Sequence, residues 1–93
     1  IFITMKCDLC ILEIKTNVYY ETEWYTILDC KDCNIPMAVW KYHRMKIPEQ
    51  GAFVMEEMLK IHAEKFYGHS DFHIDKEQKK IPNHLHWHAR LDK

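Results

Sequence analysis

The chain has 93 residues, 47% of them hydrophobic, and its 13 Lys and Arg residues nearly balance 14 Asp and Glu residues, for a net charge of −1. This length and composition predict a single folded domain over residues 1–93 and argue against a disordered chain. The sequence has no basic stripe long enough to follow a nucleic-acid backbone, which argues against a nucleic-acid-binding protein. No apolar run approaches the roughly 20 residues of a membrane span, which argues against a membrane-spanning protein.

Strand-forming residues dominate the first half of the chain. The stretch 17–29 is rich in β-branched and aromatic residues and predicts strand structure, with a kink near Glu23 and Trp24. "CKDCNIP" then predicts a turn, and "MAVWKYH" returns as a second strand. Residues from about 25 to 43 are therefore expected to form an antiparallel hairpin.

One helix and two further strands are predicted in the second half. Pro48 and Glu49 open the helix and Gly68 ends it. Between them, residues recur at helical spacing: Ala52, Met55, Met58 or Leu59, His62 and Phe66. "HSDFHID" predicts a strand, "KEQKKIPN" a polar loop and "NHLHWHAR" the last strand. This order predicts an α+β domain with an antiparallel sheet and one main helix.

The four cysteines form two pairs with metal-ligand spacing. Cys7 and Cys10 stand in "CDLC", and Cys30 and Cys33 stand in "CKDC". The sulfur atoms of such a pair can converge on one ion, so the two pairs match a four-cysteine zinc site. Disulfides and a redox-active dithiol are alternatives, but nothing in the sequence indicates secretion or a pair that opens a helix.

The last predicted strand carries three of the seven histidines at alternate positions. In a strand, His84, His86 and His88 share one face, whereas Leu85 and Trp87 share the other. Imidazoles in such a row are suited to proton transfer, nucleophilic attack or metal ligation near neutral pH. The alternative is a histidine-rich surface strand without a chemical role.

These motifs resemble the histidine triad (HIT) family of nucleotide hydrolases and transferases. "HLHWHAR" fits the alternation of histidine with hydrophobic residues, although Arg90 departs from an apolar position. "CDLC" is similar to the cysteine pair of zinc-bearing members, "VYYETEWYTILD" to a strand pair ending in a ribose-binding aspartate, and "MAVWKYH" to a strand ending in lysine, any residue, histidine. The four stretches also follow the family's order along the chain.

The resemblance implies a role for each matched residue. His86 would be the nucleophile that attacks the α-phosphorus of a nucleotide, and His88 would contact the phosphate. Asp29 would bind the ribose hydroxyls. Leu9 and Ile27 would form an apolar slot for the base, with plain core packing as the alternative for both. The expected partner is a nucleotide or a nucleotide-phosphate conjugate.

The resemblance also implies a structural zinc with mixed ligands. In zinc-bearing members and the related galactose-1-phosphate uridylyltransferases, the cysteine pair is completed by two histidines, which here gives Cys7, Cys10, His43 and His84. Such a closed site would pin the last strand. The four-cysteine site stays the alternative. The predicted hairpin places Cys30 and Cys33 at its turn and His43 at its far end, roughly 20 Å of strand away, so the two cysteine pairs share one ion only if the amino-terminal segment runs to that turn.

Departures from the family pattern leave two functions open. The usual proline-glycine-histidine is missing, and "KKIPN" replaces the glycine and serine that precede the triad. Lys79 or Lys80 would supply phosphate-binding charge instead, or belong to a solvated loop. The chain is expected to be a nucleotidyl hydrolase or transferase, or else a zinc-stabilised nucleotide-sensing or protein-interaction module without turnover.

Two further expectations concern assembly and compartment. Family members usually pair through the helix and a sheet edge, so the resemblance implies a homodimer. The stretch "IFITMKCDLC" lacks the basic, apolar and small-residue zones of a signal peptide, which predicts a cytoplasmic protein.

Overall fold

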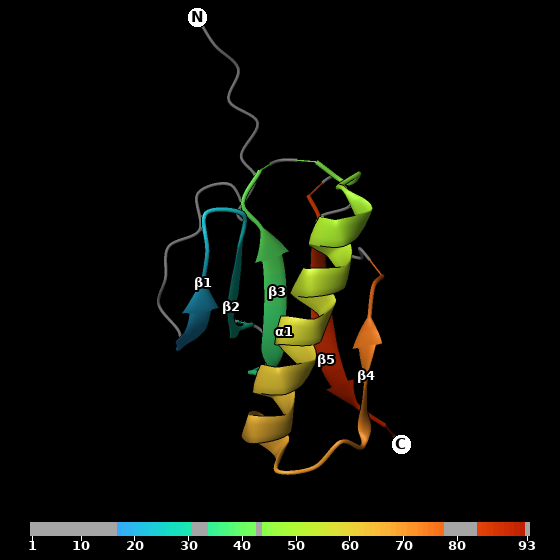
Figure 1. Cartoon of the computed structure of the whole chain (residues 1–93). Helices are drawn as coiled ribbons and strands as arrows, with labels where there is room; N and C mark the ends of the chain where they lie inside the picture. Colours follow the sequence, from blue (N-terminus) through green and yellow to red (C-terminus); the bar gives the residue numbers. More distant parts are fainter. Residues whose placement is uncertain (1–16, 31–33, 43, 78–83, 93) are drawn as a thin grey trace, which may run out of the picture.

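The computed structural model describes residues 17–30, 34–42, 44–77 and 84–92, which form one sheet and one helix (Figure 1). The elements in chain order are β1 (Val18–Glu21), β2 (Tyr25–Asp29), β3 (Pro36–Trp40), α1 (Glu49–Tyr67), β4 (Phe72–Asp75) and β5 (His86–Leu91). The prediction of an α+β fold with an antiparallel sheet and one main helix is confirmed. Within the described ranges, no helix combines the length and apolar character needed to cross a membrane.

The sheet has the strand order β1-β2-β3-β5-β4, with every neighbouring pair antiparallel. Strand β5 therefore lies between β3 and β4, although α1 and β4 separate it from β3 in the sequence. In the register, His86 faces Val39 of β3 and His88 faces Met37. On its other side, His88 faces Asp75 of β4. The histidine row thus lies inside the sheet and not at its edge.

The predicted strand region 17–29 consists of two strands joined by a tight turn. The hydroxyl oxygen of Thr22 accepts hydrogen bonds from the backbone N–H groups of Trp24 and Tyr25, at 3.0 and 3.1 Å. This local bonding competes with strand pairing and turns the chain. Strand β2 then pairs with β3 from Tyr25 opposite Trp40 to Asp29 opposite Pro36, which confirms the predicted hairpin.

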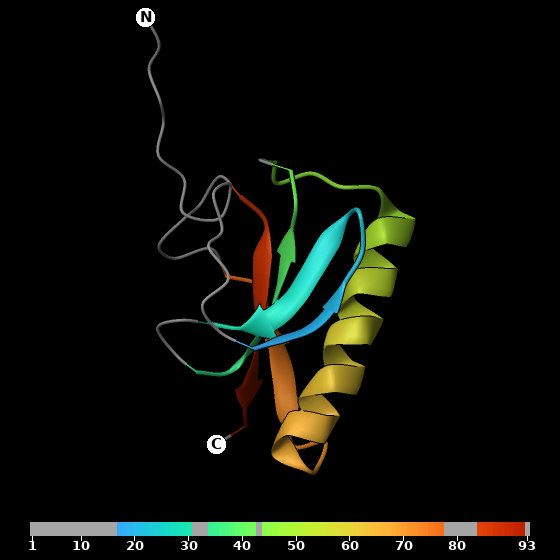
Figure 2. The ribbon, with the colours of Figure 1, turned by 90° about the vertical axis from the view of Figure 1, so that its left-hand side faces the viewer.

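Helix α1 covers one face of the sheet (Figure 2). It begins after Pro48 and ends at Gly68, as predicted. The helix ends there because Gly68 adopts a φ of 80°, which favours glycine, and its N–H donates to the Glu64 carbonyl. The buried stripe consists of Met55 and Leu59, which were predicted, and Ala63, which was not. The two predicted stripe residues nearest the end of the helix are less buried: Phe66 is exposed, and His62 stacks on Tyr19 and Tyr20.

The two faces of the sheet carry different sets of buried side chains. The face under α1 holds a cluster made up of Tyr25, Ile27, Ala38, Trp40, Leu85, Trp87 and Ala89 with the helix stripe. The opposite face holds a smaller cluster of Leu28, Cys30, Met37 and Val39. Because side chains alternate along a strand, the histidines of β5 share this second face. We call it the histidine face.

Candidate functional site

The alternation predicted for the last strand is confirmed. Leu85, Trp87 and Ala89 belong to the cluster under α1, so His84, His86 and His88 point to the opposite side. The three histidines are nevertheless buried, with exposed fractions of 0%, 6% and 8%. The predicted row of imidazoles is therefore covered, whereas the sequence indicated a row facing a cleft or partner.

His84 is fixed by the backbone of β3. Its Nε2 atom lies 2.6 Å from the carbonyl oxygen of Trp40. A carbonyl only accepts hydrogen bonds, so Nε2 carries the proton and the neutral ring has its lone pair on Nδ1. The surrounding backbone is tied on both sides, because Trp40 N–H donates to the Leu85 carbonyl and Leu85 N–H donates to the Arg44 carbonyl.

His86 is oriented by its neighbour in the row. Its Nδ1 atom lies 2.8 Å from the carbonyl oxygen of His84, and by the same reasoning Nδ1 is the protonated nitrogen. The neutral tautomer then holds its lone pair on Nε2, the atom farther from the backbone. A histidine nucleophile needs this arrangement, with one nitrogen held by an acceptor and the other presenting a lone pair.

His88 completes the row in a neutral state. Its ring centre lies 5.7 Å from that of His86, with the two planes 80° apart. Burial lowers the pKa of His88 from its ordinary value of 6.5 to about 4, and the positive charge of Arg90 lowers it further than Asp75 raises it. Its Nε2 atom is buried and has no hydrogen-bond partner in the part of the chain that the structure describes.

A charged pair lies next to His88 and was not predicted as part of the site. The Arg90 Nε atom donates to Asp75 across the β4–β5 pairing at 2.6 Å. Alternation along β5 places Arg90 on the face of His88, which is the signal that the sequence offered. Arg90 departs from the HIT pattern, and the structure supplies a physical reason for it: an ion pair with Asp75 beside the row.

Asp29 and Ile27 lie on the other face of the sheet from the histidines. Ile27 is fully buried in the cluster under α1, which is the core packing considered as its alternative. The Asp29 carboxylate accepts a hydrogen bond of 2.5 Å from the Tyr19 hydroxyl, and Tyr19 packs against that same cluster. Burial, together with this bond, raises the pKa of Tyr19. The structure therefore does not bring Asp29 and Ile27 together with His86, and Leu9 lies outside the described residues.

Of the four ligands expected for zinc, the described residues include His84 alone. Cys7, Cys10 and His43 lie outside these residues, as does Cys33 of the four-cysteine alternative. Among the residues that the structure describes, no three His, Cys, Asp or Glu side chains converge as a metal site. The tautomer of His84 fits a zinc ligand, because metal-binding histidines usually donate their second N–H to a carbonyl or carboxylate.

Comparisons with known proteins give no relative. No protein-family model, curated protein or solved structure matches the chain. The chemistry of the candidate site is therefore inferred from the geometry of the histidine face alone.

Proposed function

We propose that the protein is a HIT-like nucleotide-binding protein that hydrolyses or transfers nucleotidyl groups through His86. The observation that carries this proposal is the hydrogen bond from His86 Nδ1 to the carbonyl oxygen of His84. That bond supports a lone pair on Nε2 and keeps the ring from rotating. It also favours the covalent state, in which the phosphorylated imidazole is positively charged and its Nδ1–H needs an acceptor.

The proposed reaction has two displacements at phosphorus. His86 Nε2 attacks the α-phosphorus, a phosphorus–nitrogen bond forms, and the bond to the leaving group breaks with its electron pair going to that group. Water or another acceptor then attacks the same phosphorus and the electrons of the phosphorus–nitrogen bond return to Nε2. The leaving group takes its proton from solvent in the first step and water gives its proton to solvent in the second, so the enzyme is regenerated.

His88 has the role of phosphate ligand in this proposal. A buried polar nitrogen without a partner costs about 1–3 kcal/mol, and a phosphate oxygen accepting from Nε2–H would remove that cost. Because His86 and His88 are less than a tenth exposed, a nucleotide reaches them only when the chain around them opens. Asp29 is not used in this proposal, since it lies on the other face of the sheet.

Zinc, assembly and compartment belong to the same proposal. A structural zinc held by Cys7, Cys10, His43 and His84 would fix the start of β5 and contribute to folding.

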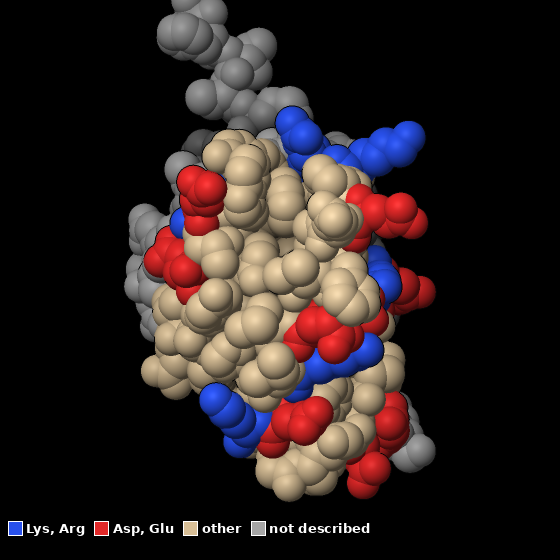
Figure 3. All heavy atoms as spheres, viewed as in Figure 1, with Lys and Arg blue, Asp and Glu red and all other residues tan. Residues whose placement is uncertain are grey.

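We place the protein in the cytoplasm, as a homodimer. Exposed apolar side chains on α1 support a pairing surface there: Phe53, Val54, Ile61 and Phe66. Figure 3, which views the helix side, has an uncharged area across its middle with charged side chains mostly around it.

A second candidate is a zinc-stabilised nucleotide sensor or interaction module without turnover. The observation that favours it is the burial of all three imidazoles, which suits a structural row. Incubation with adenosine and guanosine phosphoramidates and dinucleoside polyphosphates separates the two functions. The enzyme should release nucleoside monophosphate, and His86→Ala should abolish release while binding persists. Nucleotide binding without any turnover by the wild-type protein would favour the second candidate.

A further inference from the structure

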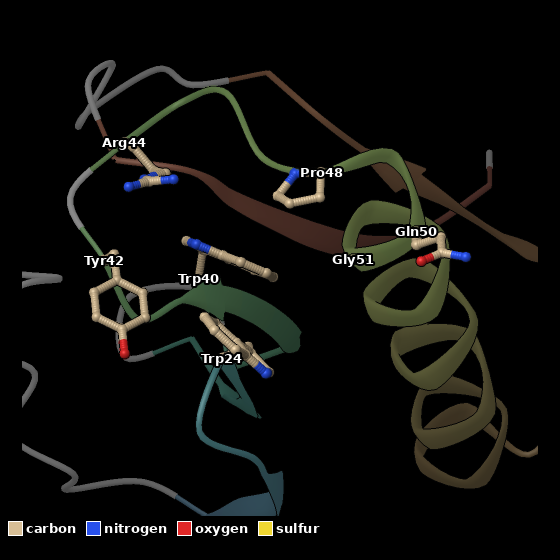
Figure 4. A pocket seen from close by; sticks show the side chains of 7 residues that line it. All are labelled: Trp24, Trp40, Tyr42, Arg44, Pro48, Gln50 and Gly51. Atoms are coloured by element: carbon tan, nitrogen blue, oxygen red, sulfur yellow. The ribbon is translucent and has the colours of Figure 1, made fainter.

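A pocket of about 330 Å³ opens between the β2–β3 hairpin and the start of α1 (Figure 4). Its lining consists of Trp24, Trp40, Tyr42, Arg44, Pro48, Gln50 and Gly51. The Trp40 side chain belongs to the cluster under α1, so this pocket lies on the side of the sheet away from the histidine face. Its volume is at the lower end of the range for small-molecule sites.

Three aromatic rings form the wall of the pocket. Trp24 stacks on Trp40 with ring centres 6.1 Å apart and planes at 22°, and Tyr42 lies 6.0 Å from Trp24 at 54°. Trp24 and Tyr42 are each 50% exposed, although large aromatic side chains gain most when they are covered. Such a wall is suited to a flat ring that stacks on the exposed aromatic faces.

Trp40 also has a hydrogen-bond donor that no described residue satisfies. The residue is 4% exposed, and its indole Nε1–H has no partner within the described part of the chain. In Figure 4 the nitrogen end of this indole points toward the side of Arg44, whereas the six-membered ring points toward Gly51. A Cβ at Gly51 would lie 3.0 Å from Trp40 Cη2, so glycine allows this close approach. The unsatisfied donor favours a ligand that brings an acceptor to the Arg44 side.

The charges around the pocket favour an anion. Arg44 lines it, and no described acidic side chain forms an ion pair with this guanidinium or lines the pocket. The first turn of α1 has N–H groups that no side chain of Pro48 caps, and its acidic residue, Glu49, does not line the pocket. Aromatic walls often hold cations, but among the described lining residues the charged side chain is that of Arg44, which opposes a cation.

We infer that this pocket binds a planar aromatic anion, with its ring against Trp24 and Tyr42 and its carboxylate or phosphate accepting from Arg44 and Trp40 Nε1–H. The site goes beyond the proposed nucleotidyl chemistry, since it lies on the opposite face of the sheet from His86. The indole nitrogen itself is buried, and Arg44 and Tyr42, both exposed, lie on its side of the pocket in Figure 4, so we expect these two side chains to move when the anionic group binds.

The test is a titration observed at the indole N–H signals of the three tryptophans. Uniformly ¹⁵N-labelled protein is titrated with 2-naphthoate, 2-naphthyl phosphate and 2-naphthylmethylamine, with Trp24→Phe and Trp87→Phe used for assignment. The Trp40 signal should shift with an anion, and the better of the two anions distinguishes carboxylate from phosphate. The amine should bind at least tenfold more weakly, because it meets Arg44 with like charge. Equal binding of the amine would overturn the inference, as would the absence of any Trp40 shift.

Matched variants locate the site. Arg44→Gln should weaken anion binding about tenfold, since it removes a charge-assisted hydrogen bond, whereas Lys46→Gln should leave it within about twofold. Trp24→Ala should likewise weaken binding of every probe, and Tyr20→Ala, which removes an exposed ring outside the pocket, should not. If Trp24→Ala fails to fold, the Arg44→Gln variant alone tests the site, because Arg44 is exposed. Wild-type affinity in Arg44→Gln would contradict the proposed ligand.

Discussion

Burial of His88 makes the stability of the protein depend on pH. The folded protein holds this imidazole neutral with a pKa of about 4, whereas the unfolded chain restores the ordinary value of 6.5. Between these values the unfolded state binds more protons than the folded state. The free energy of unfolding should therefore be highest above pH 6.5 and fall as the pH drops toward 4.

The two pKa values fix the size of the effect. Linkage gives a loss of about 2 kcal/mol in the free energy of unfolding between pH 7.5 and pH 5, and about 3 kcal/mol once the pH is below both values. The groups around the imidazole oppose one another, because Arg90 and His86 disfavour the charged ring and Asp75 favours it. Burial is the larger cause, so the sign of the effect follows from the enclosed position of the ring.

Urea unfolding at pH 7.5 and pH 5 measures this loss directly. His88→Gln keeps a polar side chain but cannot titrate, so it serves as the control for every other group that changes charge over the same range. The wild-type protein should lose about 2 kcal/mol more than His88→Gln. If both lose the same amount, the imidazole is not held neutral by burial.

Three further predictions concern the metal, the core and the assembly. Cys7→Ser should lose bound zinc and stability while Cys30→Ser keeps zinc, measured by metal analysis; equal loss would support the four-cysteine site. Leu59→Ala, at a fully buried position under the sheet, should cost about 2–5 kcal/mol in urea unfolding, and a loss below 1 kcal/mol would contradict the packing. Light scattering at micromolar concentration should give a dimer mass, and Phe53→Glu with Ile61→Glu should give a monomer; a monomeric wild type would remove the dimer.

Local patterns predicted the elements well because their causes are local. The helix bounds follow from Pro48 and Gly68, whose backbone preferences do not depend on the rest of the fold. The alternation in β5 follows from the period of a strand, which separates Trp87 from His86 wherever the strand is placed. These features needed no knowledge of neighbouring elements.

The missed features depend on partners distant in sequence. The carbonyl of Trp40 holds His84, but a backbone acceptor has no signature in the amino-acid sequence. Asp29 was expected to bind the ribose of a nucleotide at His86, but the phase of β2 relative to β5 puts it on the other face, bonded to Tyr19. The burial of the row also depends on what packs against that face of β5, which alternation alone cannot predict.

The insertion of β5 between β3 and β4 has a consequence for how the chain assembles. Within the described part of the chain, β4 pairs with β5 alone, so β4 has no place in the sheet until β5 has docked on β3. Because β5 follows β4 along the chain, a growing polypeptide carries β4 as an unpaired strand and leaves one edge of β3 open to wrong partners. Docking of β5 on β3 covers that open edge and gives β4 a partner. The segment that carries the candidate chemistry therefore also joins β4 to the rest of the sheet.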